Sequence, residues 1–167
     1  MRLFLIRHAH AEREAVDDAS RPLSERGRQT SAHVASFFRT NGQLRPAQVW
    51  HSPLRRAFET ANALVAGLEI DVPLVETDDL LPWDDPLRIT ERLATYPPVH
   101  DLALVGHEPH LSALTTLLVR DKPSPVAFHF KKSAIIALRR ADKLHGNSGF
   151  PRWKVAWHFS PELLPET

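Results

Sequence analysis

The chain of 167 residues is 43% hydrophobic and 25% charged, the composition of an ordinary globular domain with a full hydrophobic core. Its net charge of +1 gives no overall attraction to nucleic acid or anionic membranes, and its longest apolar runs are too short to cross a bilayer. It has no cysteine, which excludes disulfides, thiolate zinc sites and cysteine-based phosphatase chemistry.

The first part of the chain predicts alternating strands and helices. The expected elements are a strand at 1–6, a helix at 25–40, a strand at 48–52 and a helix at 54–68. The run Leu3–Ile6 is short, uncharged and built of large side chains, as in a buried strand. Residues 9–23 are polar and irregular. Ser24 is placed to cap the first helix, and Gly42 to end it.

The middle of the chain continues the alternation. The expected elements are an edge strand at 72–75, an acidic loop at 76–86, a helix at 87–95, a strand at 101–105 and a helix at 111–119. Pro73 favours an edge position for its strand, because proline donates no ladder hydrogen bond.

The last third predicts strands without intervening helices, at 126–130, 134–139 and 153–159, with a turn at 146–149 between the final two. Strands alternate with helices early and follow one another late. This order predicts an α/β fold: a three-layer α/β/α sandwich with a mixed, mainly parallel central sheet.

The dipeptide Arg7-His8 follows the first predicted strand directly. In open α/β sheets, ligands bind beyond the carboxyl ends of the strands. Arginine offers phosphate a planar fork of donors, and a neutral imidazole can attack phosphorus and carry the group covalently. The pair therefore predicts phosphoryl chemistry.

Two further sequence features point to the same edge. Gly106-His107 follows the strand at 101–105, so a second histidine is expected beside the first. Arg55 and Arg56 lie at the amino terminus of the helix at 54–68, where a positive charge is unfavourable unless an anion is bound. We interpret Arg55 as solvated, whereas the position of Arg56 fits either a solvated arginine or an anion ligand.

Together these segments resemble the histidine phosphatase superfamily, the phosphoglycerate mutase-like branch. Arg7–Ala9 is similar to the Arg-His-Gly signature of the family, and Ser52–Ala61 to its Ser-x-Leu-x-Arg-Ala-x-x-Thr-Ala segment. Val105–His107 resembles the segment that carries the second catalytic histidine. The chain departs from the pattern at Ala9, where the family has glycine. Because alanine resists a positive φ, we expect a slightly different loop with no loss of activity.

The compact phosphohistidine phosphatases of the SixA group resemble the chain over nearly its whole length. The segments that carry this resemblance are Arg21–Ser24 with Gly27, Val105–Ser112, Phe130–Ala134 and Trp157–Leu164. The resemblance implies one histidine phosphatase domain over residues 1–167. It also implies a short chain without the helical lids of larger relatives.

The resemblance implies a mechanism without metal or cofactor. His8 would be the nucleophile and become a phosphohistidine, which water then hydrolyses. Arg7, Arg56 and a protonated His107 would hold positive charge around the phosphoryl oxygens. His8 must be neutral to attack, and a group accepting a hydrogen bond from its other nitrogen would fix the tautomer.

An alkoxide leaving group would need a proton donor. The candidates are the carboxyls of the acidic loop, Glu76, Asp78, Asp79, Asp84 and Asp85. These acids are also what an ordinary solvated loop contains. The SixA resemblance implies that no donor acid is needed, because a phosphorylated imidazole is a better leaving group than an alkoxide.

Two more residues are candidates for substrate binding. Arg21 is placed to line the entrance and contact a protein substrate, although a surface arginine that braces its own loop is equally ordinary. His110 is expected at the rim of the pocket. His8 and His10 have a spacing that can bind metal on a strand, but no partner cluster accompanies them, so no metal site is predicted.

The leading interpretation is a phosphohistidine phosphatase that acts on a phosphorylated protein, such as a histidine-carrier domain. A small-molecule phosphomonoesterase and a non-catalytic phosphohistidine-binding module are the alternatives. No nucleic acid or membrane partner is expected. The N-terminus lacks the apolar core and cleavage site of a signal peptide, which predicts a cytoplasmic location. An open groove around the four residues would favour a protein substrate, and a lidded pit a small one.

Overall fold

The computed structural model describes residues 1–97, 99–122 and 128–164. Its centre is one six-stranded sheet with the order β3-β2-β4-β1-β5-β6. The strands are β1 (Arg2–Arg7), β2 (Gln48–His51), β3 (Leu74–Glu76), β4 (Leu102–Gly106), β5 (Ile135–Leu144) and β6 (Pro151–Phe159). The pairs β1–β4, β2–β4 and β2–β3 are parallel, and β5 pairs antiparallel with both β1 and β6. The predicted mixed, mainly parallel sheet is confirmed.

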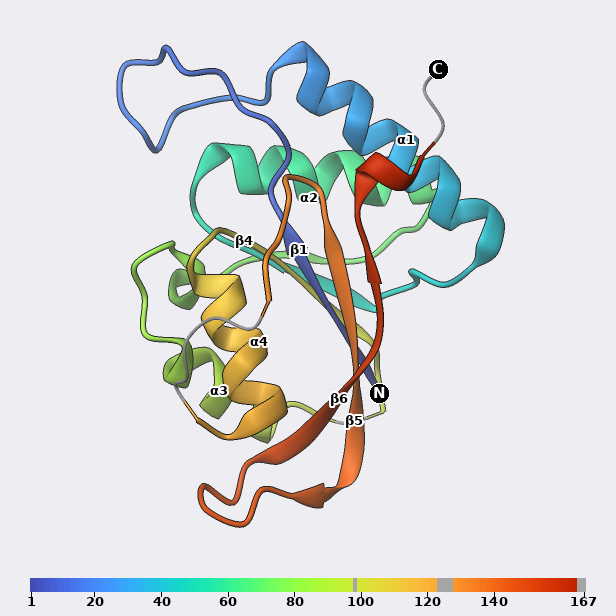
Figure 1. Cartoon of the computed structure of the whole chain (residues 1–167). Coiled ribbons are helices and arrows are strands. Elements are labelled where there is room, and N and C mark those ends of the chain that lie inside the picture. The colour runs from blue at the N-terminus through green and yellow to red at the C-terminus, as the bar shows by residue number, and fades with distance from the viewer. Residues whose placement is uncertain (98, 123–127, 165–167) are drawn as a thin grey trace.

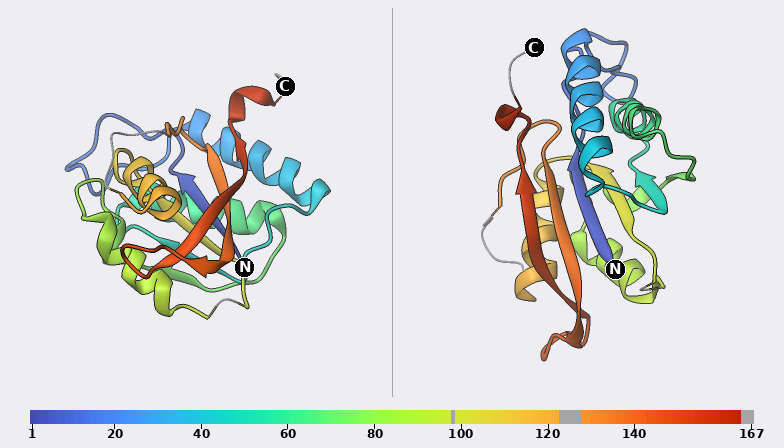
Figure 2. Two further views of the ribbon diagram at one scale, coloured as in Figure 1. Left: turned by 60° about the horizontal axis from the view of Figure 1, so that its bottom comes forward. Right: turned by 90° about the vertical axis from the view of Figure 1, so that its right-hand side faces the viewer.

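Helices cover both faces of this sheet, so the three-layer architecture is also confirmed (Figures 1 and 2). The helices are α1 (Glu25–Asn41), α2 (Arg55–Leu68), α3 (Pro86–Thr95) and α4 (His110–Arg120), with short 3-10 turns η1 (Asp78–Leu80) and η2 (Pro161–Leu163). In α1, Ser24 caps the first turn by accepting the N–H of Gly27. Gly42 ends the helix with a left-handed φ of 68°, as its position predicts.

Alternate residues of the buried strands point to opposite faces of the sheet. Leu3 and Leu5 of β1 pack with α3 and α4, whereas Phe4 and Ile6 pack with α1 and α2. This alternation follows from the two-residue period of a strand. The central strands are continuous apolar runs in the sequence because helices cover both faces of the sheet.

The expected strand at 126–130 is wrong where the structure describes it; residues 126 and 127 lie outside the described residues. Residues 128–130 form no strand. The backbone groups of Phe130 bond to side chains: its N–H donates to Glu108 Oε1 at 2.8 Å, and its carbonyl accepts Nη1 of Arg7 at 2.6 Å. A strand prediction from hydrophobicity alone does not anticipate such partners.

Three strand ends meet at one edge of the sheet. Arg7 is in register with Gly106, and the N–H of His8 donates to the carbonyl of Gly106 at 3.0 Å. On the other side of β4, the N–H of Ser52 donates to the carbonyl of Val105 at 3.0 Å. The residues after β1, β2 and β4 are therefore neighbours, although they are far apart in sequence.

Candidate active site

His8 follows β1 and has a buried side chain. Its Nδ1 lies 2.7 Å from the carbonyl oxygen of Ala9. A carbonyl oxygen only accepts hydrogen bonds, so Nδ1 carries the ring proton and Nε2 keeps its lone pair. Burial lowers the pKa of His8 to about 2, and the charges of His107 and Lys132 act in the same direction. The unliganded pocket therefore holds a neutral imidazole of fixed tautomer, as the sequence argument required of a nucleophile.

His107 lies beside His8, with 4.9 Å between the ring centroids. Its Nε2 is 2.8 Å from Oγ of Ser52, which also accepts the N–H of Leu54 at 3.3 Å. The Ser52 hydroxyl can donate to Nε2 or accept from it, because it has one proton and a second free lone pair. Within the described residues, the buried Nδ1 of His107 has no hydrogen-bond partner. When it is protonated, Nδ1 is a donor for an oxygen that enters the pocket.

His107 is held neutral by its protein surroundings. Burial lowers the pKa of His107 to about 3, and the nearby charge of Arg56 adds to that effect. Because an adjacent negative charge favours imidazolium, a phosphoryl group beside the ring would raise this pKa. The expected protonated form, which concerns the phosphate-bound site, stays a prediction.

Arg56 lies in the first turn of α2 and is only 5% exposed. Its Nη1 donates to the carbonyl of Asp18 at 2.7 Å, and its Nη2 to Asp18 Oδ2 at 3.0 Å. Arg55 points to solvent and pairs with Glu59 at 2.6 Å, so its interpretation as a solvated arginine is confirmed. A buried guanidinium at a helix amino terminus is the arrangement expected for an anion ligand.

Arg7 is held by the hydrogen bond from its Nη1 to the carbonyl of Phe130. Among the described residues, its buried Nε has no acceptor. Burial lowers the pKa of Arg7, and the carboxylate of Glu108 partly offsets this. Arg7 and Arg56 each keep donors that the surrounding chain does not use fully.

Asp18 is a residue that the sequence argument missed. Its carboxylate bridges Arg56 and Arg21, with 2.9 Å between Asp18 Oδ1 and Arg21 Nη1. The hydrogen bond from Arg21 is the main reason that the pKa of Asp18 lies below its usual range. Arg21 also donates Nε to the carbonyl of Glu12 at 2.6 Å. It braces the loop of residues 9–23, and its contact with a protein substrate stays a prediction.

Thr60 joins two parts of the site. Its Oγ1 accepts the N–H of Ala9 at 3.0 Å and donates to the carbonyl of Arg56 at 2.6 Å. Ala9 is fully buried and is not among the residues with positive φ. The alanine therefore fits this loop without strain, and the expected departure from a glycine conformation has no steric consequence here.

The turn of Lys131–Ser133 supplies a further cation. Ser133 has a φ of 61°, and its N–H donates to the carbonyl of Arg7 at 3.2 Å. Lys132 is close enough to the arginines for its pKa to be lowered, mainly by burial and then by the charge of Arg7. The sequence singled out this segment as a family resemblance but not Lys132 as a site residue.

His110 is buried, and its expected place at the pocket rim stays a prediction. As the first residue of α4 it turns inward and is 2% exposed, and neither ring nitrogen has a partner among the described residues. Burial lowers its pKa, while Asp84 and Asp79 raise it. The acidic loop therefore faces His110.

Three acids of that loop have local structural roles. Asp84 accepts the N–H of Leu81 at 2.7 Å, Asp85 caps α3, and Asp79 pairs with Arg92 at 3.3 Å. Glu76 and Asp78 are exposed. Within the described chain, none of the five candidates hydrogen-bonds to the four pocket residues Arg7, His8, Arg56 and His107.

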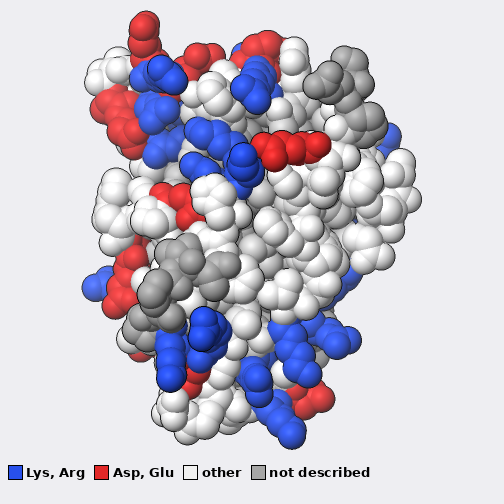
Figure 3. All heavy atoms as spheres, viewed as in Figure 1, with Lys and Arg blue, Asp and Glu red and all other residues white. Residues whose placement is uncertain are grey.

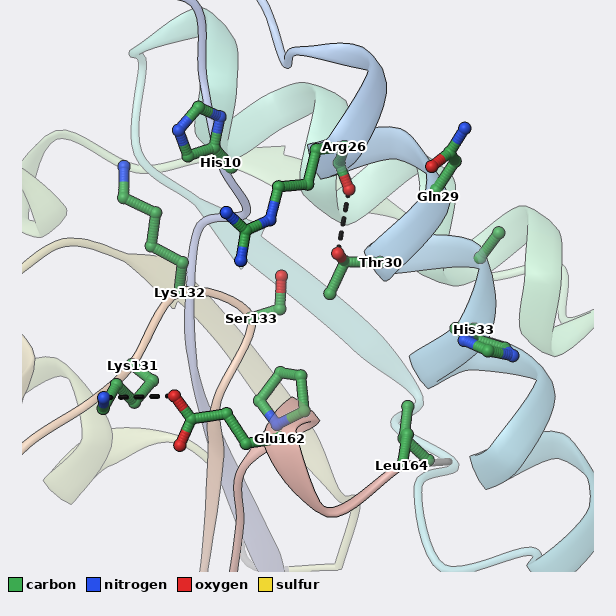
Figure 4. Close-up of a pocket in the computed structure, with 12 residues that line it drawn as sticks. His10, Arg26, Gln29, Thr30, His33, Lys131, Lys132, Ser133, Glu162 and Leu164 are labelled. Atoms are coloured by element: carbon green, nitrogen blue, oxygen red, sulfur yellow. Dashed lines mark hydrogen bonds and ion pairs between the residues drawn. The ribbon is translucent and has the colours of Figure 1, made fainter. Parts of the chain in front are cut away.

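A groove with a volume of about 890 Å³ lies beside this pocket. It is lined by His10, Arg26, Lys132 and Ser133 among others, and it does not include the four pocket residues (Figure 4). Figure 3 shows Lys and Arg side chains gathered on the upper part of the same face, with acidic side chains at their border. The site is thus bordered by an open, positively charged surface.

The family comparison supports the sequence resemblance. A model of the histidine phosphatase superfamily (branch 1) matches residues 3–84. The match covers slightly less than half of the chain, and over this segment the chain is similar to the superfamily. The matched residues include Arg7, His8 and Arg56, whereas His107 lies beyond them. No curated protein sequence matches the chain.

Solved structures share the fold of this chain over almost its full length. The protein histidine phosphatase SixA complexed with tungstate has a TM-score of 0.81 at 24% identity, covering 96% of this chain and 97% of its own. A SixA phosphohistidine phosphatase from Agrobacterium tumefaciens has a TM-score of 0.77 at 22% identity, with 96% and 97% covered. The alpha-ribazole phosphatase from Shigella flexneri has a TM-score of 0.70 at 18% identity, with 93% and 95% covered. At these identities the likeness concerns the fold.

Within the described residues, no group of three or more His, Asp or Glu side chains is placed to hold a metal ion. No helix there combines the length and apolar character needed to cross a membrane.

Proposed function

We propose that this protein is a histidine phosphatase that removes the phosphoryl group from a phosphohistidine on a protein, through a covalent phosphohistidine on His8. The observation that carries the proposal is the hydrogen bond from His8 Nδ1 to the carbonyl of Ala9. It leaves the Nε2 lone pair free beside His107, Arg7 and Arg56, the groups that would bind phosphoryl oxygens.

The proposed reaction has two displacements at phosphorus. In the first, Nε2 of His8 forms a bond to phosphorus while the bond from phosphorus to the substrate imidazole breaks. The substrate imidazole carries a proton on its other ring nitrogen, so the released nitrogen keeps the bonding electron pair and the ring leaves as neutral imidazole. In the second, water attacks phosphorus, the bond to Nε2 breaks, and inorganic phosphate leaves. Splitting one displacement into two lowers each barrier.

The chain would stabilise both transition states by charge and hydrogen bonds. Arg7 and Arg56 supply fixed positive charge, and Nδ1–H of His107 supplies a donor that Ser52 orients from the other side of the ring. Such preorganised groups act strongly in a buried site. A bound phosphoryl group would also raise the pKa of His107, so the ring would gain charge when the substrate arrives.

The acidic loop supports phosphohistidine over a phosphate ester as substrate. Three of the five candidate donor acids are engaged in the loop itself, at Leu81, in the α3 cap and at Arg92. An alkoxide would need such a donor, whereas a neutral imidazole leaves without one. The open groove and the fold shared with SixA phosphatases also support a phosphohistidine substrate on a protein.

The test is a substrate panel with a phosphohistidine peptide, a phosphorylated histidine-carrier domain and a sugar phosphate. The proposal expects the peptide and the carrier domain to be preferred, and His8→Asn to abolish turnover. Acid-labile, base-stable phosphate trapped on His8 and then released would separate catalysis from simple binding. Full activity of His8→Asn would reject the mechanism.

A small-molecule phosphomonoesterase is the second candidate. The observation that favours it is the exposure of Glu76 and Asp78, the two loop acids without a hydrogen-bond partner among the residues that the structure describes. If this candidate function is correct, the sugar phosphate is the preferred substrate, and Glu76→Gln or Asp78→Asn lowers the turnover of the sugar phosphate. Such a result would replace the phosphohistidine proposal.

A further inference from the structure

The groove beside the pocket contains positive charges without counter-ions. Among the described residues, Arg26 of α1 and Lys132 form no ion pair, whereas Lys131 pairs with Glu162 at 3.1 Å. Arg26 reaches across the groove from α1 toward the turn that carries Lys132 and Ser133 (Figure 4). Two cations of opposite walls thus face the same space.

Ser133 adds an independent observation. It is 97% buried, since only 3% is exposed, and its Oγ has no hydrogen-bond partner among the described residues. Figure 4 shows this hydroxyl pointing toward the guanidinium of Arg26. A buried polar group without a partner costs free energy, and an incoming acceptor would satisfy it. The left-handed φ of 61° at Ser133 is a strained conformation for a residue other than glycine.

The groove is continuous with the catalytic segment. The N–H of Ser133 donates to the carbonyl of Arg7 at 3.2 Å, and His10 lies two residues after His8. Lys132 lies between the two regions, because its charge acts on His8 while its side chain lines the groove. A substrate with its phosphoryl group at His8 would therefore place neighbouring groups over Arg26 and Lys132.

We propose that Arg26, Lys132 and Ser133 form an anion-binding subsite that receives a carboxylate of the protein substrate close to its phosphohistidine. The inference rests on the proposed function and names a sequence preference for it: aspartate or glutamate beside the phosphorylated histidine. A guanidinium binds carboxylate through two parallel hydrogen bonds, and the serine hydroxyl donates a third.

The dimensions and charge of the groove favour a protein carboxylate over a second phosphate. A volume of about 890 Å³ exceeds the space that one phosphate fills, and the groove extends along α1 past Gln29 and His33 to η2. Glu162 places a negative charge at its edge, which disfavours a dianion more than a single carboxylate. An extended substrate surface fits this shape.

The experiment compares two phosphohistidine peptides that differ only in their flanking residues, one with Asp and Glu and one with Asn and Gln. The acidic peptide is expected to have a KM about fivefold lower at equal kcat, the size of a partly exposed charge-assisted contact. Arg26→Gln is expected to remove this difference by raising the KM of the acidic peptide alone. Glu162→Gln is expected to lower that KM.

Arg39→Gln is the matched control, because Arg39 lies near the other end of α1 and pairs with Glu69. It is expected to leave both KM values unchanged. Equal KM values for the two peptides, or an equal effect of Arg26→Gln on both, would overturn the subsite. An Arg26-dependent KM for a sugar bisphosphate without peptide dependence would also overturn it. Turnover of a sugar phosphate with no turnover of either peptide would instead reject the proposed function.

Discussion

The carboxylate of Asp18 lies 3.0 Å from Nη2 of Arg56, on the guanidinium that we assign to the substrate phosphate. The second oxygen of Asp18 bonds to Arg21, so one carboxylate spans two arginines. The carbonyl of Asp18 also accepts Nη1 of Arg56. Asp18 thus has two opposing effects: it orients Arg56, and it neutralises part of the charge that would attract phosphate.

Replacement of Asp18 by asparagine should separate these effects. Asp18→Asn keeps the backbone carbonyl that bonds to Arg56 but removes the negative charge. Because the Asp18 side chain is 56% exposed and solvent screens it, the expected effect is small. Inhibition by inorganic phosphate should tighten by about two- to fivefold, an effect of at most about 1 kcal/mol. Inhibition constants at low ionic strength measure it.

The control for this prediction is Asp17→Asn. Asp17 is a neighbouring acid that accepts the N–H of Ser20 and does not contact Arg56. It should leave phosphate inhibition unchanged. Weaker inhibition in Asp18→Asn than in the wild type would show that orientation of Arg56 outweighs the competing charge.

Thr60 is predicted to be a positioning residue. Thr60→Val keeps the shape of the side chain but leaves the buried N–H of Ala9 without an acceptor, at a cost of about 1–3 kcal/mol in stability. It also uncouples the His8–Ala9 segment from Arg56, so kcat should fall by about tenfold or more while KM changes little. Steady-state kinetics and urea denaturation measure the two effects.

Thr60→Ser tests whether the hydroxyl is responsible, because serine keeps the donor and the acceptor. This variant should retain kcat near the wild-type value. If Thr60→Ser and Thr60→Val lost the same kcat, the methyl group and its packing would explain the effect, and positioning by the hydroxyl would be excluded.

Ala9→Gly tests the departure from the family signature. Ala9 has no positive φ and its side chain is buried, so glycine gains nothing in the folded state and adds freedom to the unfolded chain. We expect unchanged kcat and a loss of roughly 0.5–1 kcal/mol in the free energy of unfolding. A rise in kcat would show that the alanine constrains the catalytic loop.

The sequence predicts those parts of the site that follow from regular elements. Arg7 ends a buried strand, His8 and His107 come directly after such strands, and Arg56 lies in the first turn of the helix that follows another. The geometry of a parallel sheet brings these positions to one edge. Their clustering was therefore predictable without any knowledge of side-chain contacts.

The remaining site residues depend on irregular backbone, which the sequence pattern does not determine. Asp18 lies in the loop of residues 9–23, whose path is held by long-range bonds such as the N–H of Arg55 to the carbonyl of Ala19. Lys132 follows the segment at 128–130, where side-chain partners replace the expected strand. His110 faces the interior because of how α4 packs. Each of these depends on tertiary contacts between segments far apart in the chain.

Acid should destabilise the protein through its two pocket histidines. The pKa of His8 is about 2 and that of His107 about 3 in the folded state, against 6.5 in the unfolded chain. Below pH 6.5 the unfolded chain therefore binds protons that the folded protein does not. The free energy of unfolding falls as pH decreases from about 6.5 toward 3, and these groups do not affect it above that range.

The two histidines together correspond to a loss of unfolding free energy on the order of 2 kcal/mol between pH 6 and pH 5. Urea denaturation at these pH values measures it. His8→Asn and His107→Asn should each remove about half of this contribution, and His110, whose pKa burial also lowers, should keep part of the remaining pH dependence. His33→Asn, on α1 outside the pocket, should remove none of the contribution of His8 and His107. An unchanged pH dependence in both pocket variants would show that neither imidazole is held neutral by burial, and would remove the physical basis for His8 as an unprotonated nucleophile.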